Sequence, residues 1–232
     1  MQTNRQALTK VLLSFLVSLI FFTSWLFEVY QFDPNEYCDF DGIYYQDAGK
    51  MYQPIKESDY SLTGMEYAYV CNINDLHLGK LTEFENITRL GVTRGNVGVI
   101  GKNIKDIKKL DWLQVQDQEI SWVPKEIGEV KTLKYLNLSG NNITDLPEEL
   151  GDLDGLETFY VYDNQLSSLP DSIGRLKNLK VLDIHSNQIA SIPFSILELS
   201  ENLEVMYLGE NRLTKEDKNW LINALPKTKI YF

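Results

Sequence analysis

A period of 23 residues in the apolar side chains is the feature that most limits what this chain can fold into. When the chain is aligned with itself at this shift, large apolar residues fall into five columns through residues 87–213. The first column is Ile87, Leu110, Leu133, Leu156, Leu179 and, after one extra residue, Leu203. Because one such unit cannot bury its apolar face alone, six stacked units sharing one core are expected.

Each unit predicts a short strand followed by a compact return. In Leu136-Asn137-Leu138 the two leucines share one face, because side chains alternate along a strand. An asparagine amide just after the strand is suited to bond the turning backbone. These asparagines are Asn141, Asn164, Asn187 and Asn211. Gln118 keeps an amide at that position, whereas Gly95 does not, so the first unit is expected to be the least regular.

In four units a proline directly follows the fifth apolar column, and its ring fixes φ where the chain leaves the turn. The prolines are Pro124, Pro147, Pro170 and Pro193. The I-x-x-L spacing that follows predicts a 3₁₀ or helical return. Residues 133–153, LKYLNLSGNNITDLPEELGDL, show the whole pattern.

This pattern resembles the leucine-rich repeat family in its 23-residue form, including bacterial members. The resemblance implies an α/β solenoid, a horseshoe with short parallel strands on its concave face and 3₁₀ or helical returns. Residues 87–213 are the six repeats, and residues 214–232 predict a C-terminal capping helix and edge strand. Residues 31–86 predict an N-terminal cap with a degenerate first strand at Tyr67-Ala68-Tyr69, 23 residues before Leu90-Gly91-Val92.

Residues 1–30 are of a different kind, since residues 11–27 contain no charge, glycine or proline. Arg5 and Lys10 precede this stretch and Glu28 follows it, which is the charge order of an export signal. We expect an uncleaved signal-anchor or transmembrane helix, with the repeats outside the cytoplasm, in the periplasm or at the cell surface. A cleaved signal peptide, which would give a secreted protein, and a buried soluble helix are the alternatives.

The two cysteines would then lie in a compartment that permits disulfides. A bridge between Cys38 and Cys71 is one hypothesis, and two unrelated buried thiols are the alternative.

Composition argues against several classes of function. The 22 Lys and Arg against 33 Asp and Glu give a net charge of −11, which disfavours nucleic acid as a partner. Two histidines and two cysteines predict no metal site or cofactor. Residues 95–102 lack the spacing of a phosphate loop, and Asp183, His185 and Ser186 on one short segment cannot form a catalytic triad. No enzyme is therefore predicted.

The positions that alternate with the core leucines are expected to face outward on the concave face. They carry a set of aromatic and imidazole rings, bordered by carboxylates. The rings are Trp112, Tyr135, Tyr160, Tyr162, His185 and Tyr207, and the carboxylates are Asp117, Asp163, Asp183 and Glu210. Exposed aromatics with polar ends are typical of binding hot spots. A self-supporting aromatic ladder is the alternative, because such residues also stabilise neighbouring strands.

From these features we expect a non-catalytic module that is displayed by a membrane anchor at residues 11–27. Its ligand class, a protein or peptide, is implied by the family resemblance. The acidic border predicts a basic or neutral partner. A structural component of the cell envelope, or a protein that binds carbohydrate through the same aromatics, is the alternative.

Overall fold

The computed structural model describes residues 42–46, 53–54, 67–71, 86–93 and 98–232, all within one compact unit. The predicted anchor at residues 11–27 and the predicted disulfide partner Cys38 lie outside these ranges, and the side chain of Cys71 is not described. Most of the predicted cap at residues 31–86 and the turn at Gly95 also lie outside them. Among the described residues, no helix has the length and apolar character needed to cross a membrane.

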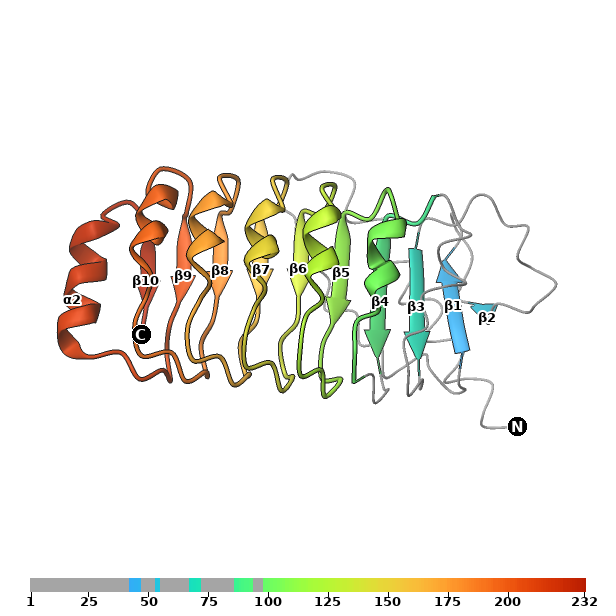
Figure 1. The fold of residues 1–232 in the computed structure, drawn as a ribbon, viewed down its shortest axis with the longest axis horizontal. Helices are drawn as coiled ribbons and strands as arrows, with labels where there is room; N and C mark the ends of the chain where they lie inside the picture. Colours follow the sequence, from blue (N-terminus) through green and yellow to red (C-terminus); the bar gives the residue numbers. More distant parts are fainter. Residues whose placement is uncertain (1–41, 47–52, 55–66, 72–85, 94–97) are drawn as a thin grey trace, which may run out of the picture. The chain divides into compact units, whose positions relative to one another are not determined.

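The described strands form one 10-stranded sheet, in the order β10-β9-β8-β7-β6-β5-β4-β3-β1-β2. The strands are β1 (Gly42–Gln46), β2 (Gln53–Pro54), β3 (Tyr67–Cys71), β4 (Arg89–Thr93), β5 (Trp112–Val115), β6 (Tyr135–Asn137), β7 (Thr158–Tyr160), β8 (Val181–Asp183), β9 (Val205–Tyr207) and β10 (Lys229–Tyr231). All neighbouring pairs from β3 to β10 are parallel, whereas β1 pairs antiparallel with β2 and β3. From β3 to β10, strands that are adjacent in the chain thus lie side by side, whereas β1 lies between β2 and β3 (Figure 1).

A helical return follows each strand from β4 to β9. The returns are the 3₁₀ turns η4 (Lys102–Asp106), η5 (Lys125–Glu129), η6 (Glu148–Asp152), η7 (Asp171–Arg175) and η8 (Phe194–Leu199), and then the α-helix α2 (Lys215–Ala224). A proline precedes each of η5 to η8, with φ of −68, −69, −66 and −64° in chain order. The helical turns overlie the sheet on one side (Figure 1). The predicted solenoid of short parallel strands and 3₁₀ returns is confirmed.

The core lies between the sheet and the returns. Its residues are the predicted apolar columns, and from Ile87 to Leu179 the first column is 0% exposed. Full burial of one such side chain stabilises the fold by about 1.5–3 kcal/mol. The shared core therefore supplies most of the free energy that holds neighbouring repeats together.

The repeated asparagines form a hydrogen-bonded ladder behind the strands. The Asn164 side chain donates to the Leu138 carbonyl of the preceding unit at 3.0 Å and to the Val161 carbonyl of its own unit at 3.1 Å. Its Oδ1 accepts from the Ile143 N–H at 3.0 Å. At the position of Gln118 the side-chain amide likewise donates to carbonyls of its own unit, Gln116 and Asp117.

The residue just before each ladder amide has a left-handed backbone. The φ values are 57° at Asp117, 66° at Gly140, 54° at Asp163, 51° at Ser186 and 55° at Glu210. Glycine adopts this conformation freely, and Asp is among the few other residues that tolerate it. This turn directs the chain from the sheet into the ladder.

Glycines in three successive returns set how closely the repeats stack, a role that the sequence analysis missed. These residues are Gly128, Gly151 and Gly174. A Cβ atom added at any of them would collide with backbone of the following unit. At Gly151 the obstacle is the Ser172 carbonyl. Their regular spacing of 23 residues was the signal available in the sequence.

Helix α2 covers the C-terminal end of the core. Thr214 caps it, since its hydroxyl accepts from the Asp217 N–H at 3.1 Å and the Asp217 carboxylate accepts from the Thr214 N–H at 3.0 Å. The hydrogen bond from the Thr214 side chain is the main cause that lowers the pKa of Asp217. Leu221 and Leu225 are buried at 0% and 1% exposure. Strand β10 then adds to β9 in parallel.

The expected 23-residue offset of the first strand was wrong. In the structure β3 pairs with β4 at an offset of 22 residues, with Ala68 opposite Leu90 and Val70 opposite Val92. A slip of one residue exchanges the two faces of a strand. The core residues Leu90 and Val92 are therefore paired with Ala68 and Val70, whereas Tyr67 and Tyr69 are paired with Arg89 and Gly91.

Candidate functional site

The predicted ring residues lie on one face of the sheet, opposite the core. We call this set the aromatic face, and it comprises Trp112, Tyr135, Tyr160, Tyr162, His185 and Tyr207. Their positions alternate with fully buried residues such as Leu113, Leu136 and Phe159. Most of the set is half-buried, and Tyr207 is 37% exposed. Strand alternation thus places Trp112, Tyr135, Tyr160 and Tyr207 on this surface. Tyr162 and His185 lie shortly after the ends of β7 and β8.

The rings contact one another across neighbouring strands. Trp112 stacks on Tyr135 with centroids 5.2 Å apart, and Tyr135 meets Tyr160 edge-on at 5.6 Å. Tyr162 stacks on His185 at 4.6 Å. Contacts of this kind contribute about 0.5–1.5 kcal/mol beyond area burial. The rings therefore support one another and also remain partly open to solvent.

Tyr207 has a partner that the sequence analysis did not include. It stacks on Tyr231 of β10 with centroids 4.9 Å apart and planes 13° apart. The register places Tyr231 directly opposite Tyr207, so the contact follows from the pairing of β10 with β9. To predict this contact from the sequence, one would need to know the register in which the last strand pairs with β9.

Asp183 differs from the expected exposed border, because the residue is only 8% exposed. It lies directly opposite Tyr160 on one side and Tyr207 on the other. Its Oδ1 accepts from the His185 N–H at 3.2 Å and lies 2.6 Å from His185 Nδ1. A carboxylate set between two large rings and bonded to its own strand has little contact with water.

The other three border carboxylates are exposed and lie at the left-handed turns. Ser186 Oγ donates to Glu210 Oε2 at 2.7 Å. Burial raises the pKa of Asp117, and the negative charge of Asp163 raises it further, while a hydrogen bond from Gln116 opposes both. Asp117 and Asp163 therefore act on one another electrostatically across the intervening unit.

Burial also perturbs the tyrosines of the aromatic face. It raises the pKa of Tyr135 to about 12, with a hydrogen bond involving Asn137 acting in the opposite direction. The pKa values of Tyr160 and Tyr162 are raised as well, first by burial. The charge of Asp183 is the next cause at Tyr160, and that of Asp117 at Tyr162. These tyrosines are therefore neutral hydroxyl groups at physiological pH.

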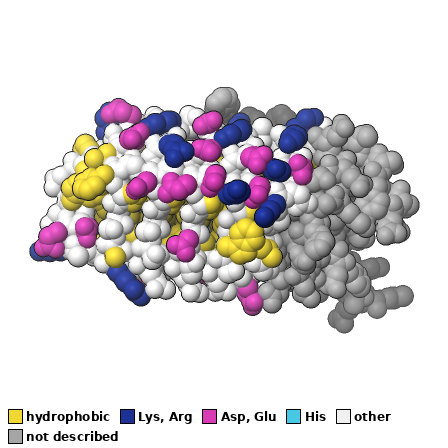
Figure 2. Space-filling view, in the orientation of Figure 1, with side chains coloured by type: hydrophobic (Ala, Val, Ile, Leu, Met, Phe, Trp, Pro, Cys, Tyr) yellow, Lys and Arg dark blue, Asp and Glu magenta, His cyan; other side chains and the backbone are white. Residues whose placement is uncertain are grey.

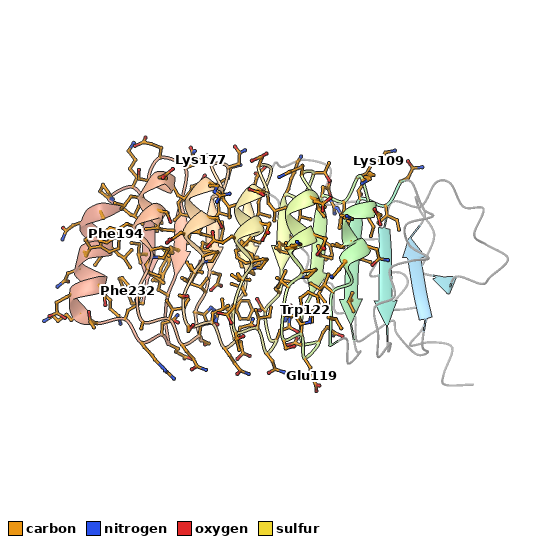
Figure 3. The ribbon with its side chains drawn as sticks, in the orientation of Figure 1. Lys109, Glu119, Trp122, Lys177, Phe194 and Phe232 are labelled. Atoms are coloured by element: carbon orange, nitrogen blue, oxygen red, sulfur yellow. The ribbon has the colours of Figure 1, made fainter. Side chains whose placement is uncertain are left out.

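The side that carries the helical turns has a different character. Lys, Arg, Asp and Glu side chains are mixed over it (Figure 2). Several pair across neighbouring repeats, as Arg175 does with Asp152 at 3.0 Å and Lys177 with Glu198 at 2.6 Å. Figure 3 places Phe194 and Phe232 near α2, and Trp122 toward the other end of the repeats. Exposed pairs of this kind are worth about 0–1 kcal/mol each and define no site.

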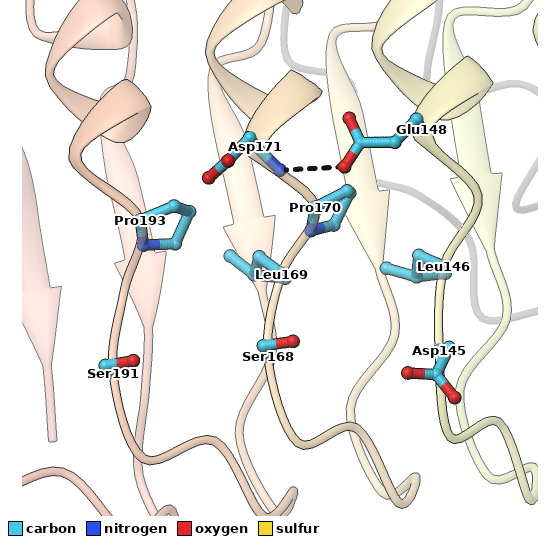
Figure 4. Close-up of a pocket in the computed structure, with 9 residues that line it drawn as sticks. All are labelled: Asp145, Leu146, Glu148, Ser168, Leu169, Pro170, Asp171, Ser191 and Pro193. Carbon is cyan, nitrogen blue, oxygen red and sulfur yellow. Dashed lines mark hydrogen bonds between the residues drawn. The ribbon is translucent and has the colours of Figure 1, made fainter.

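A groove on the side of the returns is shallow and polar (Figure 4). It is lined by Asp145, Leu146, Glu148, Ser168, Leu169, Pro170, Asp171, Ser191 and Pro193. The Glu148 carboxylate accepts from the Asp171 N–H at 3.2 Å and the Ser172 N–H at 3.0 Å, which caps η7. Within the described part of the chain, no cluster of His, Cys, Asp and Glu is arranged to hold a metal ion.

Comparison with known proteins identifies the repeats. Residues 125–216 match a family model described as a leucine-rich repeat region. This match, together with the solenoid fold, supports assignment of these residues to the leucine-rich repeat family. A solved leucine-rich repeat protein of Leptospira interrogans is 32% identical, with a TM-score of 0.64, and the match covers 66% of this chain and 39% of that one. No curated protein sequence matches the chain.

A second solved structure is the plant peptide hormone receptor RGFR1 in complex with RGF2. It is 25% identical with a TM-score of 0.64, and the match covers 77% of this chain and 30% of that one. The leucine-rich repeat chain thus spans less than half the length of either structure.

Proposed function

We propose that the leucine-rich repeats bind a protein or peptide through the aromatic face and carry out no reaction. The observation that carries the proposal is the continuous run of Trp112, Tyr135 and Tyr160 in ring contact on the sheet face opposite the core. Rigid aromatics of this kind bury much area at little cost in side-chain entropy. The fold supports binding only by analogy, because fold alone does not establish function.

The neighbouring structures add support for the ligand class. The plant receptor is solved in complex with a peptide hormone partner. Leucine-rich repeat regions are typically non-catalytic, which agrees with a role in recognition. The absence of Lys and Arg from the outward positions between Trp112 and Glu210 supports a basic or neutral partner.

The location of the module forms a second part of the proposal. Residues 11–27 would anchor the chain in a membrane and place the repeats outside the cytoplasm, or direct secretion if the segment is cleaved. Protease protection of the repeats in intact cells, together with the mass of the mature chain, distinguishes these arrangements. Degradation of the repeats only after lysis of the cytoplasmic membrane, and neither in intact cells nor after permeabilisation of an outer membrane, would contradict export.

The binding proposal is tested by crosslinking from position 160 in the producing cells. Capture of one reproducible protein or peptide, lost when Tyr162 is replaced by Ala, is the expected result. Lys177→Ala is the matched control, because Lys177 pairs with Glu198 on the side of the returns. Retention of purified glycans in place of protein would favour the alternative carbohydrate-binding function, and capture unaffected by Tyr162→Ala would refute binding through this face.

A further inference from the structure

We infer that Asp183 and the rings around it receive a lysine or arginine side chain of the partner. This inference rests on the proposed function, because it specifies what that partner presents to the aromatic face. The residues concerned are Tyr160, Asp183, His185 and Tyr207, which we call the Asp183 cluster.

The first support is the position of the carboxylate. Asp183 is directly opposite Tyr160 on β7 and Tyr207 on β9, so a ring-bearing residue stands on each side of it. The residue is 8% exposed, and 11% of its side-chain surface is open. A carboxylate buried to this extent needs hydrogen-bond donors for its oxygens, because loss of water disfavours its charge.

The second support is the unequal use of the two carboxylate oxygens. Both hydrogen bonds from His185, through its N–H and its Nδ1, end on Oδ1. Among the described residues, Oδ2 accepts no hydrogen bond, and it is not sealed from solvent. His185 is itself held, because its ring stacks on Tyr162. One oxygen is therefore fixed by the protein, and the other remains available to an incoming donor.

The third support is charge. The outward positions from Trp112 to Glu210 contain four carboxylates and no Lys or Arg. Lys180 on the neighbouring repeat is paired with Glu157 at 2.5 Å, and the outward cations Arg89 and Lys229 lie on β4 and β10, not on the strands that flank Asp183. A cationic side chain from outside would therefore meet attraction near Asp183.

The rings favour an organic cation over a neutral hydrogen-bond donor. An ammonium or guanidinium group is attracted to a tyrosine face, and more strongly when water is excluded. A charge-assisted hydrogen bond to Oδ2 adds to this attraction. Tyr207 is the most open of the rings at 37% exposure, so it offers the approaching side chain its contact. A lysine or arginine side chain of a peptide can both lie against a tyrosine ring and donate a hydrogen bond to Asp183 Oδ2.

The test uses the full chain and a peptide library in which one central position is fixed as Lys, Arg, Gln or Glu. The flanking positions are random, and retention is measured by sequencing bound peptides. The unchanged protein is expected to retain Lys and Arg peptides at least about tenfold better than Gln peptides. Asp183→Asn is expected to remove this preference while peptides as a class remain bound.

Matched variants separate recognition from folding. Tyr207→Phe keeps the ring and is expected to keep the preference, whereas Tyr207→Leu is expected to reduce it several-fold. Asp171→Asn removes an exposed carboxylate on the side of the returns and is expected to change the preference by less than about twofold. These substitutions retain a melting transition that can be compared directly with the unchanged chain.

The possible failures are distinct. If no peptide is retained by any form of the protein, the proposed function fails and the inference fails with it. If peptides are retained without preference for Lys or Arg, or if the preference survives Asp183→Asn, the proposed function stands and the inference is overturned.

Discussion

Tyr162 and His185 lie on neighbouring units with their ring centroids 4.6 Å apart and their planes 11° apart. His185 also contacts the Asp183 carboxylate through Nδ1. The stacked pair of Tyr162 and His185 therefore connects the aromatic rings to Asp183, the most buried carboxylate of this face. This contact predicts that the effects of replacing Tyr162 and His185 on the free energy of unfolding are coupled, although the two residues are 23 positions apart in the chain.

A double-mutant cycle measures this coupling. Tyr162→Ala and His185→Ala are each expected to destabilise the protein, and the double variant to lose less than the sum of the two. The expected coupling free energy is about 0.5–1.5 kcal/mol, because each single change already removes the ring contact. Chemical denaturation of the four proteins gives the value. Additive losses would show that the stacking contributes no stability.

Gly151 provides a test of how closely the repeats must stack. Gly151→Ala is expected to destabilise the protein by about 2 kcal/mol, because the new Cβ would press on the Ser172 carbonyl of the next unit. Gly98→Ala is the matched control, since no atom lies within 4 Å of the Cβ position there. Equal midpoints for the two variants in denaturant would mean that the next repeat moves aside without cost.

The contribution of the asparagine ladder to stability can be tested by replacing one asparagine inside the ladder and one outside it. Asn164→Ala is expected to cost about 1–3 kcal/mol, because the buried Ile143 N–H loses its acceptor. The Leu138 and Val161 carbonyls each lose one donor and keep the amides of Asn141 and Asn187. Asn142→Ala serves as the control, because Asn142 is exposed and its side chain only accepts from Gln165. Thermal unfolding of both variants checks the difference. A smaller loss at Asn164 than at Asn142 would contradict a structural role for the ladder.

Periodicity was sufficient to predict the core, the ladder and the placement of the rings. Leu136 and Leu138 face the core because strand side chains alternate, and the same alternation puts Tyr135 on the other face. The prolines before η5 to η8 likewise have the φ that their ring imposes. Each of these features is local, or repeats at a constant spacing.

Features that depend on a particular neighbour were not predicted. The burial of Asp183 arises from Tyr160 and Tyr207 on the adjoining strands, and no repeat pattern specifies which residues flank a single carboxylate. The register of β3 also departed from expectation, because its offset from β4 is 22 residues. The approach of Asp183 to His185 was recognisable in principle, since residues two apart on one strand share a face.

Asp117 makes the pH dependence of stability testable. Burial raises its pKa in the folded protein, with a further contribution from the charge of Asp163. The folded state therefore holds this proton more tightly than the unfolded chain does, and stability attributable to this group falls as pH rises above the usual value of 3.8. At neutral pH the ionised carboxylate is unfavourable for folding.

Asp117→Asn is accordingly expected to stabilise the protein at pH 7 by about 0.5 kcal/mol or less, a small value because Asp117 is largely solvated. Asn keeps the shape that lies beside Gly140 and tolerates the φ of 57° at this position. The advantage should disappear at pH 3, where both states of the original protein are protonated. Asp163→Asn removes a charge that adds to this effect, so it is expected to give a smaller gain in the same direction. Melting curves at the two pH values give the comparison, and a variant that is less stable at pH 7 but not at pH 3 would show that the Asp117 carboxylate is favourable in the folded state.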